Sequence, residues 1–394
     1  MKKRALPFAI TVMIASQSSA FAESFNAQNQ AQDALLAKQQ TPGAPIRDQK
    51  MQDDLADKRD AASGDDHRSW YRHIEIAGLI EIDASVLDPY AGKRNSDVRL
   101  STFELGITSQ VNEWIKATAS LLYEQDETNL EIDVASITLA NTDVTPMFVT
   151  AGQIYVPFGV YKTNLVSDPL PLELGETRET ALQLGFVKGD ISGSAYVFHG
   201  DHLVNGEDQI GSWGASLSYA HEQNDRAWSF GVGYINDLGG ADTLREVIHD
   251  NRVAALEADS KFGSDPIAGW TVNAAAVFGK FNLIGEYLAA TDDFDAHSLE
   301  FRDQNARPSA WNIETGVSFP IMRRKSIASV SYQGTRESLA LELPRARWSV
   351  GWSVEIFAHT SVALECAHDI DYSKADGGTG NASNRILAQL AVEF

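Results

Sequence analysis

Six charged residues lie close together between two predicted strands, in a stretch that also holds three prolines. They are, in chain order, Lys162, Asp168, Glu173, Glu176, Arg178 and Glu179. A charged loop can select passing molecules by size and charge when it narrows a water-filled passage. The alternative is a solvated surface loop whose charges only keep it soluble. We favour the first interpretation, in which the stretch 157–179 folds inward as a constriction loop.

A second set of charged side chains alternates with apolar neighbours along the predicted strands. The polar, inward-facing positions are Glu81, Glu104, Lys116, Glu286, Glu314, Arg347, Glu355 and Arg385. Carboxylates outnumber cations in this set, so a passage lined by it would concentrate cations. For any one of these residues, pairing across strands to stiffen the wall is an equal alternative.

The sequence gives little support for a catalytic site or a metal site. His199, Asp201 and His202 are ligand types that suit a transition metal, but a short cluster of this kind in a loop is usually solvated polar surface. The other histidines that we considered lie in turns or alone on strands, and none is paired with a nucleophile: His221, His297, His359 and His368. We therefore predict no catalytic residue, no metal site, no cofactor and no enzyme activity.

Strands with one apolar and one polar face must position these side chains. In the last segment, Ile386, Leu390 and Phe394 alternate with Arg385 and Gln389, the period of a half-buried strand. The same period predicts about sixteen strands, at 73–86, 98–111, 114–124, 130–140, 147–156, 180–188, 190–199, 211–221, 226–235, 269–279, 280–290, 308–319, 325–335, 345–358, 360–372 and 383–394. An even number is typical of bacterial single-chain barrels.

Aromatic residues favour a membrane barrel over a soluble β-sandwich. The alternation predicts one ring from Trp114, Trp228, Phe278, Phe319 and Phe394, and a second from Tyr123, Tyr155, Tyr234, Tyr287, Tyr332, Trp213, Trp270, Trp311 and Trp348. Two such rings flanking an apolar band are typical of the membrane interfaces. Closure would also satisfy every backbone N–H and C=O group inside lipid. We predict an all-β fold, a closed antiparallel transmembrane β-barrel with short and long connections at opposite ends.

The first residues predict export. Lys2, Lys3 and Arg4 precede an apolar stretch and the small residues that end at Ala22, so residues 1–22 have the pattern of a signal peptide. Residues 23–69 are rich in Gln, Asp and Ala and predict a periplasmic spacer, helical or disordered. Association of subunits into a homotrimer through this spacer is a hypothesis. Residues 70–394 form the predicted barrel.

Composition excludes two further possibilities. Cys366 is the one cysteine, so no intrachain disulfide can form. The formal net charge of −22 argues against a nucleic-acid partner, because phosphate would be repelled. The expected partners are outer-membrane lipid and a small-molecule solute.

One stretch also carries a resemblance to a known family. The run from Ala151 to Tyr161, AGQIYVPFGVY, together with Ser167-Asp168-Pro169-Leu170 and Glu179-Thr180-Ala181-Leu182-Gln183, resembles the LbtU-type siderophore porins. Its Gln-x-x-x-Pro-Phe-Gly portion also looks like phosphate-selective and related porins. Membership would imply an outer-membrane channel or receptor that takes up an iron-loaded siderophore.

We therefore expect passive, substrate-selective uptake of small solutes across the outer membrane of a bacterium, with an iron-siderophore complex as the solute that the resemblance implies. A general or phosphate-type diffusion porin is the alternative, although a phosphate channel needs a ladder of inward Lys and Arg. An outer-membrane hydrolase is disfavoured for want of a nucleophile with a nearby base.

Overall fold

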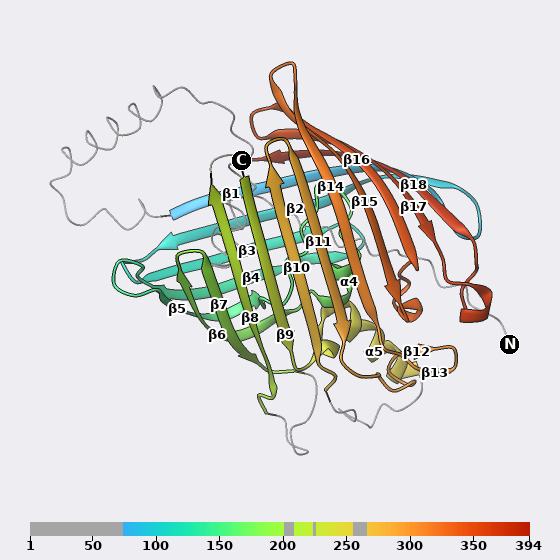
Figure 1. Cartoon of the computed structure of the whole chain (residues 1–394), viewed down its shortest axis with the longest axis horizontal. Helices are drawn as coiled ribbons and strands as arrows, with labels where there is room; N and C mark the ends of the chain where they lie inside the picture. Colours follow the sequence, from blue (N-terminus) through green and yellow to red (C-terminus); the bar gives the residue numbers. More distant parts are fainter. Residues whose placement is uncertain (1–73, 201–208, 224–225, 255–265) are drawn as a thin grey trace.

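The computed structural model describes residues 74–200, 209–223, 226–254 and 266–394. The predicted signal peptide and spacer lie outside these residues, as do Asp201 and His202 of the metal cluster that we considered. The described part of the chain is mainly strand (Figure 1).

Sixteen of the described strands form one closed barrel in which every neighbouring pair is antiparallel. Strand β1 pairs with β2 on one side and with β18 on the other, which closes the ring. The strands are β1 (Ile74–Asp88), β2 (Asn95–Gln110), β3 (Ile115–Glu124), β4 (Thr128–Ala140), β5 (Met147–Tyr155), β6 (Arg178–Lys188), β7 (Ile191–Phe198), β8 (Ser212–Gln223), β9 (Arg226–Ile235), β10 (Gly269–Phe278), β11 (Phe281–Ala290), β14 (Ser309–Ile321), β15 (Arg324–Arg336), β16 (Ala346–Phe357), β17 (Thr360–Ile370) and β18 (Ala382–Glu393). The predicted closed antiparallel barrel is confirmed.

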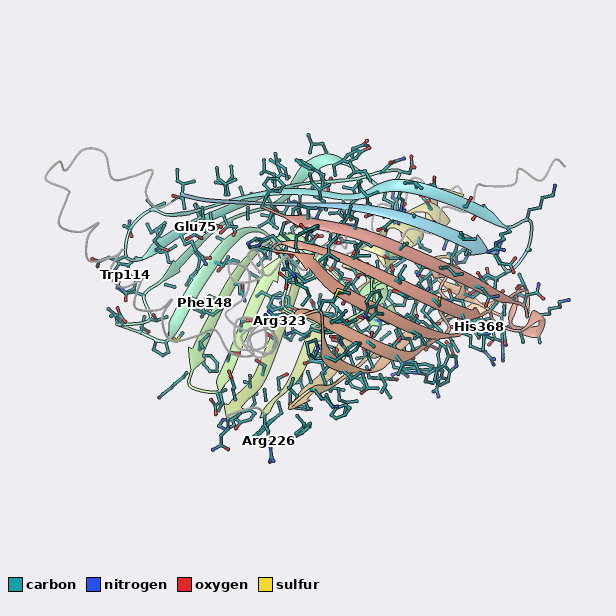
Figure 2. The ribbon with its side chains drawn as sticks, turned by 90° about the horizontal axis from the view of Figure 1, so that it is seen from above. Glu75, Trp114, Phe148, Arg226, Arg323 and His368 are labelled. Carbon is teal, nitrogen blue, oxygen red and sulfur yellow. The ribbon has the colours of Figure 1, made fainter. Side chains whose placement is uncertain are left out.

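The connections alternate in length around the ring. Tight turns such as 189–190, 279–280 and 322–323 lie at one end, and the long connections 156–177 and 236–268 lie at the other. In Figure 2, Trp114 and Phe148 lie near the end with the turns, and His368 lies near the opposite end. We call these the turn end and the loop end.

Strand β9 shows how the sequence builds a two-faced wall. Trp228, Phe230, Val232 and Tyr234 are exposed on the outside, whereas the residues between them are small and buried. Side chains on a strand alternate between its two faces, so this pattern puts an apolar surface outside and leaves room inside. An exposed apolar surface of this extent suits contact with lipid rather than with water.

The aromatic ring at the loop end runs over consecutive strands. Tyr234 lies opposite Trp270, Tyr287 opposite Trp311, and Tyr332 opposite Trp348. The ring centroids of Tyr332 and Trp348 are 4.4 Å apart. Tyr155 does not belong to this exposed ring, contrary to the prediction. It lies where β5 ends, and its hydroxyl donates a hydrogen bond to Asp133 Oδ1 at 2.7 Å, which draws the side chain into a polar network.

Helices occur only in the connections of the described chain. The short helix α4 (Leu170–Gly175) belongs to the connection between β5 and β6, and α5 (Asp242–Ala254) to that between β9 and β10. The spacing of Leu244, Val247 and Ile248 in the sequence indicates a helix within the connection 236–268, where α5 lies. A two-stranded hairpin, β12 (Glu300–Phe301) with β13 (Gln304–Asn305), lies in the next loop. None of the described helices combines the length and the apolar character needed to cross a membrane.

Candidate functional site

The connection 156–177, which we call the β5–β6 loop, is attached to the inward face of the barrel wall by side-chain carboxylates. Glu286 of β11 accepts hydrogen bonds from the backbone N–H groups of Val160, at 3.0 Å, and Tyr161, at 2.6 Å. Glu314 of β14 accepts from the Thr163 hydroxyl at 2.6 Å and from the Asn164 N–H at 2.7 Å. These bonds join residues more than a hundred positions apart in the chain.

The attachment continues on the next strands around the ring. Glu365 of β17 accepts from the N–H groups of Val166, at 2.9 Å, and Ser167, at 2.8 Å. Gln333 of β15 accepts from the Leu170 N–H at 2.8 Å. Buried backbone N–H groups need acceptors, and a loop that leaves the sheet has no neighbouring strand to supply them. The wall carboxylates and the Gln333 amide oxygen fill that role, and bonds to a charged acceptor are the stronger ones.

Glycines in the wall mark where the loop passes close to a strand. A Cβ on Gly233 of β9 would collide with the Phe158 carbonyl oxygen, and one on Gly351 of β16 would meet the Leu165 side chain. At Gly233 the loop approaches with its backbone, which leaves no room for a side chain, whereas at Gly351 it approaches with the end of the Leu165 side chain. The wall is therefore shaped to accept the loop at both of these strands.

An apolar cluster anchors the far part of the loop. Helix α4 begins after Pro169 and carries Pro171 in its first turn, where the missing N–H is not needed. Its Leu170 and Leu174 are fully buried with Leu288 of β11 and Leu244 of α5. Helix α5 also joins the loop through its backbone, because the Asp242 N–H donates to the Glu176 carbonyl oxygen at 2.9 Å.

Elsewhere on the barrel wall and in the loops next to it, charged side chains form ion pairs. Arg99 of β2 lies 2.7 Å from Glu127, and Arg347 of β16 lies 2.7 Å from Asp369 of β17. Arg178 forms ion pairs with two residues of β4, with distances of 2.6 Å to Glu131 and 3.1 Å to Asp133. Arg245 of α5 lies 2.7 Å from Glu179. The inward surface is therefore a network of both signs rather than a uniform acidic lining.

Glu173, on α4, lies within electrostatic range of this network. Burial raises the pKa of Glu173 to about 7, and the opposing influence of Arg347 and Arg385 limits the rise. Burial likewise raises the pKa of Glu176 well above its ordinary value, and nearby Asp242 adds to that rise.

The predicted site residues divide by position. Lys162, Asp168 and Glu173 are buried in the β5–β6 loop, and Glu176 is half-buried there. The prediction that Arg178 and Glu179 belong to the loop is wrong. They are the first two residues of β6, because pairing with Tyr155 and Ile154 of β5 extends the strand to them. That these residues set selectivity stays a prediction.

The predicted wall residues also fall into two groups. Glu81, Glu104, Glu286, Glu314 and Arg347 are buried, and Lys116, Glu355 and Arg385 are half-buried. Glu286 and Glu314 hold the loop, so their negative charge faces loop N–H groups.

Several residues of the network were not among the predicted ones, and four of them lie closest to the loop and the arginines discussed below. They are Glu365, Gln333, Arg99 and Asp369. Alternation with the exposed Leu364 and Cys366 could have placed Glu365 on the inward face of β17. The described residues contain no group of three or more His, Cys, Asp or Glu side chains arranged to hold a metal ion.

Comparison with known proteins supports the fold more than any particular activity. No protein-family model matches the chain. A UPF0422 protein of Coxiella burnetii is 27% identical over 334 residues, covering 80% of this chain and 69% of its own length. Among solved structures, an anion-selective porin from Comamonas acidovorans matches with a TM-score of 0.55 and 11% identity, covering 82% of this chain and 99% of that one. Pseudomonas putida OprB matches with a TM-score of 0.58 and 8% identity, covering 84% and 96%. The chain therefore has a porin-like fold.

Proposed function

We propose that this protein is a channel of a bacterial outer membrane through which small solutes diffuse passively. The observation that carries the proposal is the position of the β5–β6 loop inside a closed ring. The ring is apolar outside, and charged side chains line its inner face. Such a ring satisfies its own backbone in lipid, and the charged loop narrows the space that it encloses.

Reconstitution in planar lipid bilayers tests this proposal directly. The purified mature chain in potassium chloride should produce stepwise increases of conductance. The same preparation unfolded by boiling in detergent should produce none. Silent bilayers with a protein that circular dichroism shows to be folded would overturn the channel proposal.

An iron-loaded siderophore is the solute that the family resemblance adds to the proposal. Block of the open channel by ferric siderophores, compared with their iron-free forms, measures whether the passage accepts them. A current that no ferric siderophore alters would remove this solute and leave a general diffusion porin. A phosphate-type channel is the less favoured alternative, because Arg99 and Arg347 already have carboxylate partners. Equal permeability to phosphate and chloride would count against it.

A homotrimer is the proposed assembly. The spacer 23–69 that we expect to contribute lies outside the described residues. The mass of the oligomer in detergent, with and without that spacer, measures its contribution, and an unchanged mass would show that the spacer has none.

A further inference from the structure

Three arginines from separate strands of the wall lie within electrostatic range of one another, on the side of the ring that the β5–β6 loop reaches. They are Arg99 of β2, Arg347 of β16 and Arg385 of β18, and the charge of Arg385 interacts with those of the other two. Strands β1 and β17 separate the three strands around the ring. The cluster faces Glu173 of α4, whose carboxyl senses the charges of both Arg347 and Arg385.

Two of these arginines are neutralised by carboxylates in contact with them. Arg99 Nη1 lies 2.7 Å from Glu127 Oε1. Arg347 makes a two-point contact with Asp369, from Nε to Oδ1 at 2.7 Å and from Nη2 to Oδ2 at 3.1 Å. A bidentate pair of this kind fixes the guanidinium and cancels most of its field at close range.

Arg385 differs from them in its partners. Its Nη2 donates a hydrogen bond to the Ser167 hydroxyl oxygen, which is neutral, and no carboxylate of the described residues forms an ion pair with it. Four carboxyls interact with its charge from further away: Glu365, Asp369, Asp83 and Glu173. Glu365 accepts the N–H groups of Val166 and Ser167, and Asp369 binds Arg347.

Arg385 also lies where a solute would pass. On β18 it alternates with the outward-facing Ile386, so its side chain points to the inside of the ring. Its contact with Ser167 places it beside the β5–β6 loop, and its side chain is half-buried rather than covered. The guanidinium keeps N–H donors for a group that enters from the lumen.

We infer that Arg385 is the specificity-determining residue of the passage and binds an anionic oxyacid group, a carboxylate or a phosphate, on the passing solute. This inference rests on the proposed channel function and names its solute class. The planar guanidinium matches both groups with two parallel hydrogen bonds, which an ammonium group cannot do. An acidic chain can thus bind an anionic solute at this point, because Arg385 offers N–H donors while Glu365 is engaged by the loop and Asp369 by Arg347.

Bilayer measurements of ion selectivity test the inference. The reversal potential in a potassium chloride gradient gives the ratio of potassium to chloride permeability for the wild type, Arg385→Gln and Arg385→Lys. Loss of one charge within several ångströms of a passing ion should raise that ratio roughly three- to tenfold in Arg385→Gln. Arg385→Lys should keep the wild-type ratio in chloride because the charge remains.

Two probes separate the sources of the anionic group. Acetate and phosphate, each supplied as its potassium salt, should both lose permeability in Arg385→Gln and more weakly in Arg385→Lys. A loss confined to one probe assigns the site to that group. The matched control is Arg324→Gln, which removes an exposed arginine at the first position of β15, next to the tight turn 322–323.

The outcomes distinguish this inference from the channel proposal. Wild-type bilayers that stay silent would refute the channel itself. Open, folded Arg385→Gln channels with wild-type selectivity, or the same change in Arg324→Gln, would refute the role of Arg385 alone. Circular dichroism and the migration of unboiled protein in gels report whether each variant is folded.

Discussion

Removing the Glu314 carboxylate should release the middle of the β5–β6 loop from the wall while the barrel stays folded. Glu314 is fully buried and accepts three hydrogen bonds, from the Thr163 hydroxyl and from the N–H and side-chain amide of Asn164. Glu314→Ala deletes the acceptor for all three. Glu286 and Glu365 still hold the loop on either side.

The magnitude follows from the bonds that are lost. A hydrogen bond to a charged acceptor contributes about 1.5–3 kcal/mol net, and a donor left buried without a partner costs about as much again. Some donors will find water once the loop moves, so we take about 3–4 kcal/mol for the local change. Every 1.4 kcal/mol is about tenfold in an equilibrium constant, so local opening should rise roughly a hundred- to a thousandfold.

Amide hydrogen exchange at residues 163–167 measures this opening in the intact barrel. Exchange should accelerate there in Glu314→Ala and remain unchanged in the strands. Glu314→Gln keeps one acceptor oxygen and should show a smaller effect. The control, Glu113→Ala, removes an exposed carboxylate from the turn between β2 and β3. Unchanged loop exchange in a folded Glu314→Ala barrel would refute the view that this carboxylate holds the loop.

Two further predictions concern charge and lipid. Since burial raises the pKa of Glu173 to about 7, against the influence of Arg347 and Arg385, raising the pH from about 6 to 8 should add a negative charge at the loop and shift selectivity toward cations. Reversal potentials across that range should show a step that Glu173→Gln lacks, and an equal step in the variant would contradict the assignment. Val350 is 60% exposed on the outside of β16, so Val350→Arg should lower stability in lipid by about 2–4 kcal/mol. Urea unfolding in vesicles measures this, with Glu113→Arg as the control, and equal stability of the two variants would mean that Val350 does not face lipid.

The strands were predictable because their information is local. In β9, a period of two in side-chain polarity is enough to separate Trp228 and Phe230 from Ser229 and Gly231. The ends of strands were less predictable, since pairing with a neighbour decides them. Arg178 and Glu179 continue β6 because Tyr155 and Ile154 of β5 lie opposite them. Nothing in the residues 176–180 themselves indicates where the strand begins.

The roles of the inward carboxylates could not be predicted from local pattern. Alternation placed Glu286 and Glu314 on the polar face, and they are buried there. Their partners, however, are backbone N–H groups of Tyr161 and Asn164, more than a hundred residues away in the chain. A backbone N–H has no signature in the sequence, so only the path of the loop reveals which carboxylates it uses.

That distinction changes what the acidic composition implies for transport. The net charge of −22 suggests a passage that favours cations, and the count of inward carboxylates points the same way. Yet Glu286, Glu314 and Glu365 direct their charge at loop N–H groups, while Asp369 directs its charge at Arg347. The N–H donors leave the net charge of such a carboxylate in place, but they hold its oxygens against the loop, so those oxygens are not offered to a passing solute. A solute can contact directly only groups that keep hydrogen-bonding atoms for it, and Arg385, which is bonded through one N–H to the Ser167 hydroxyl, is such a group beside the loop.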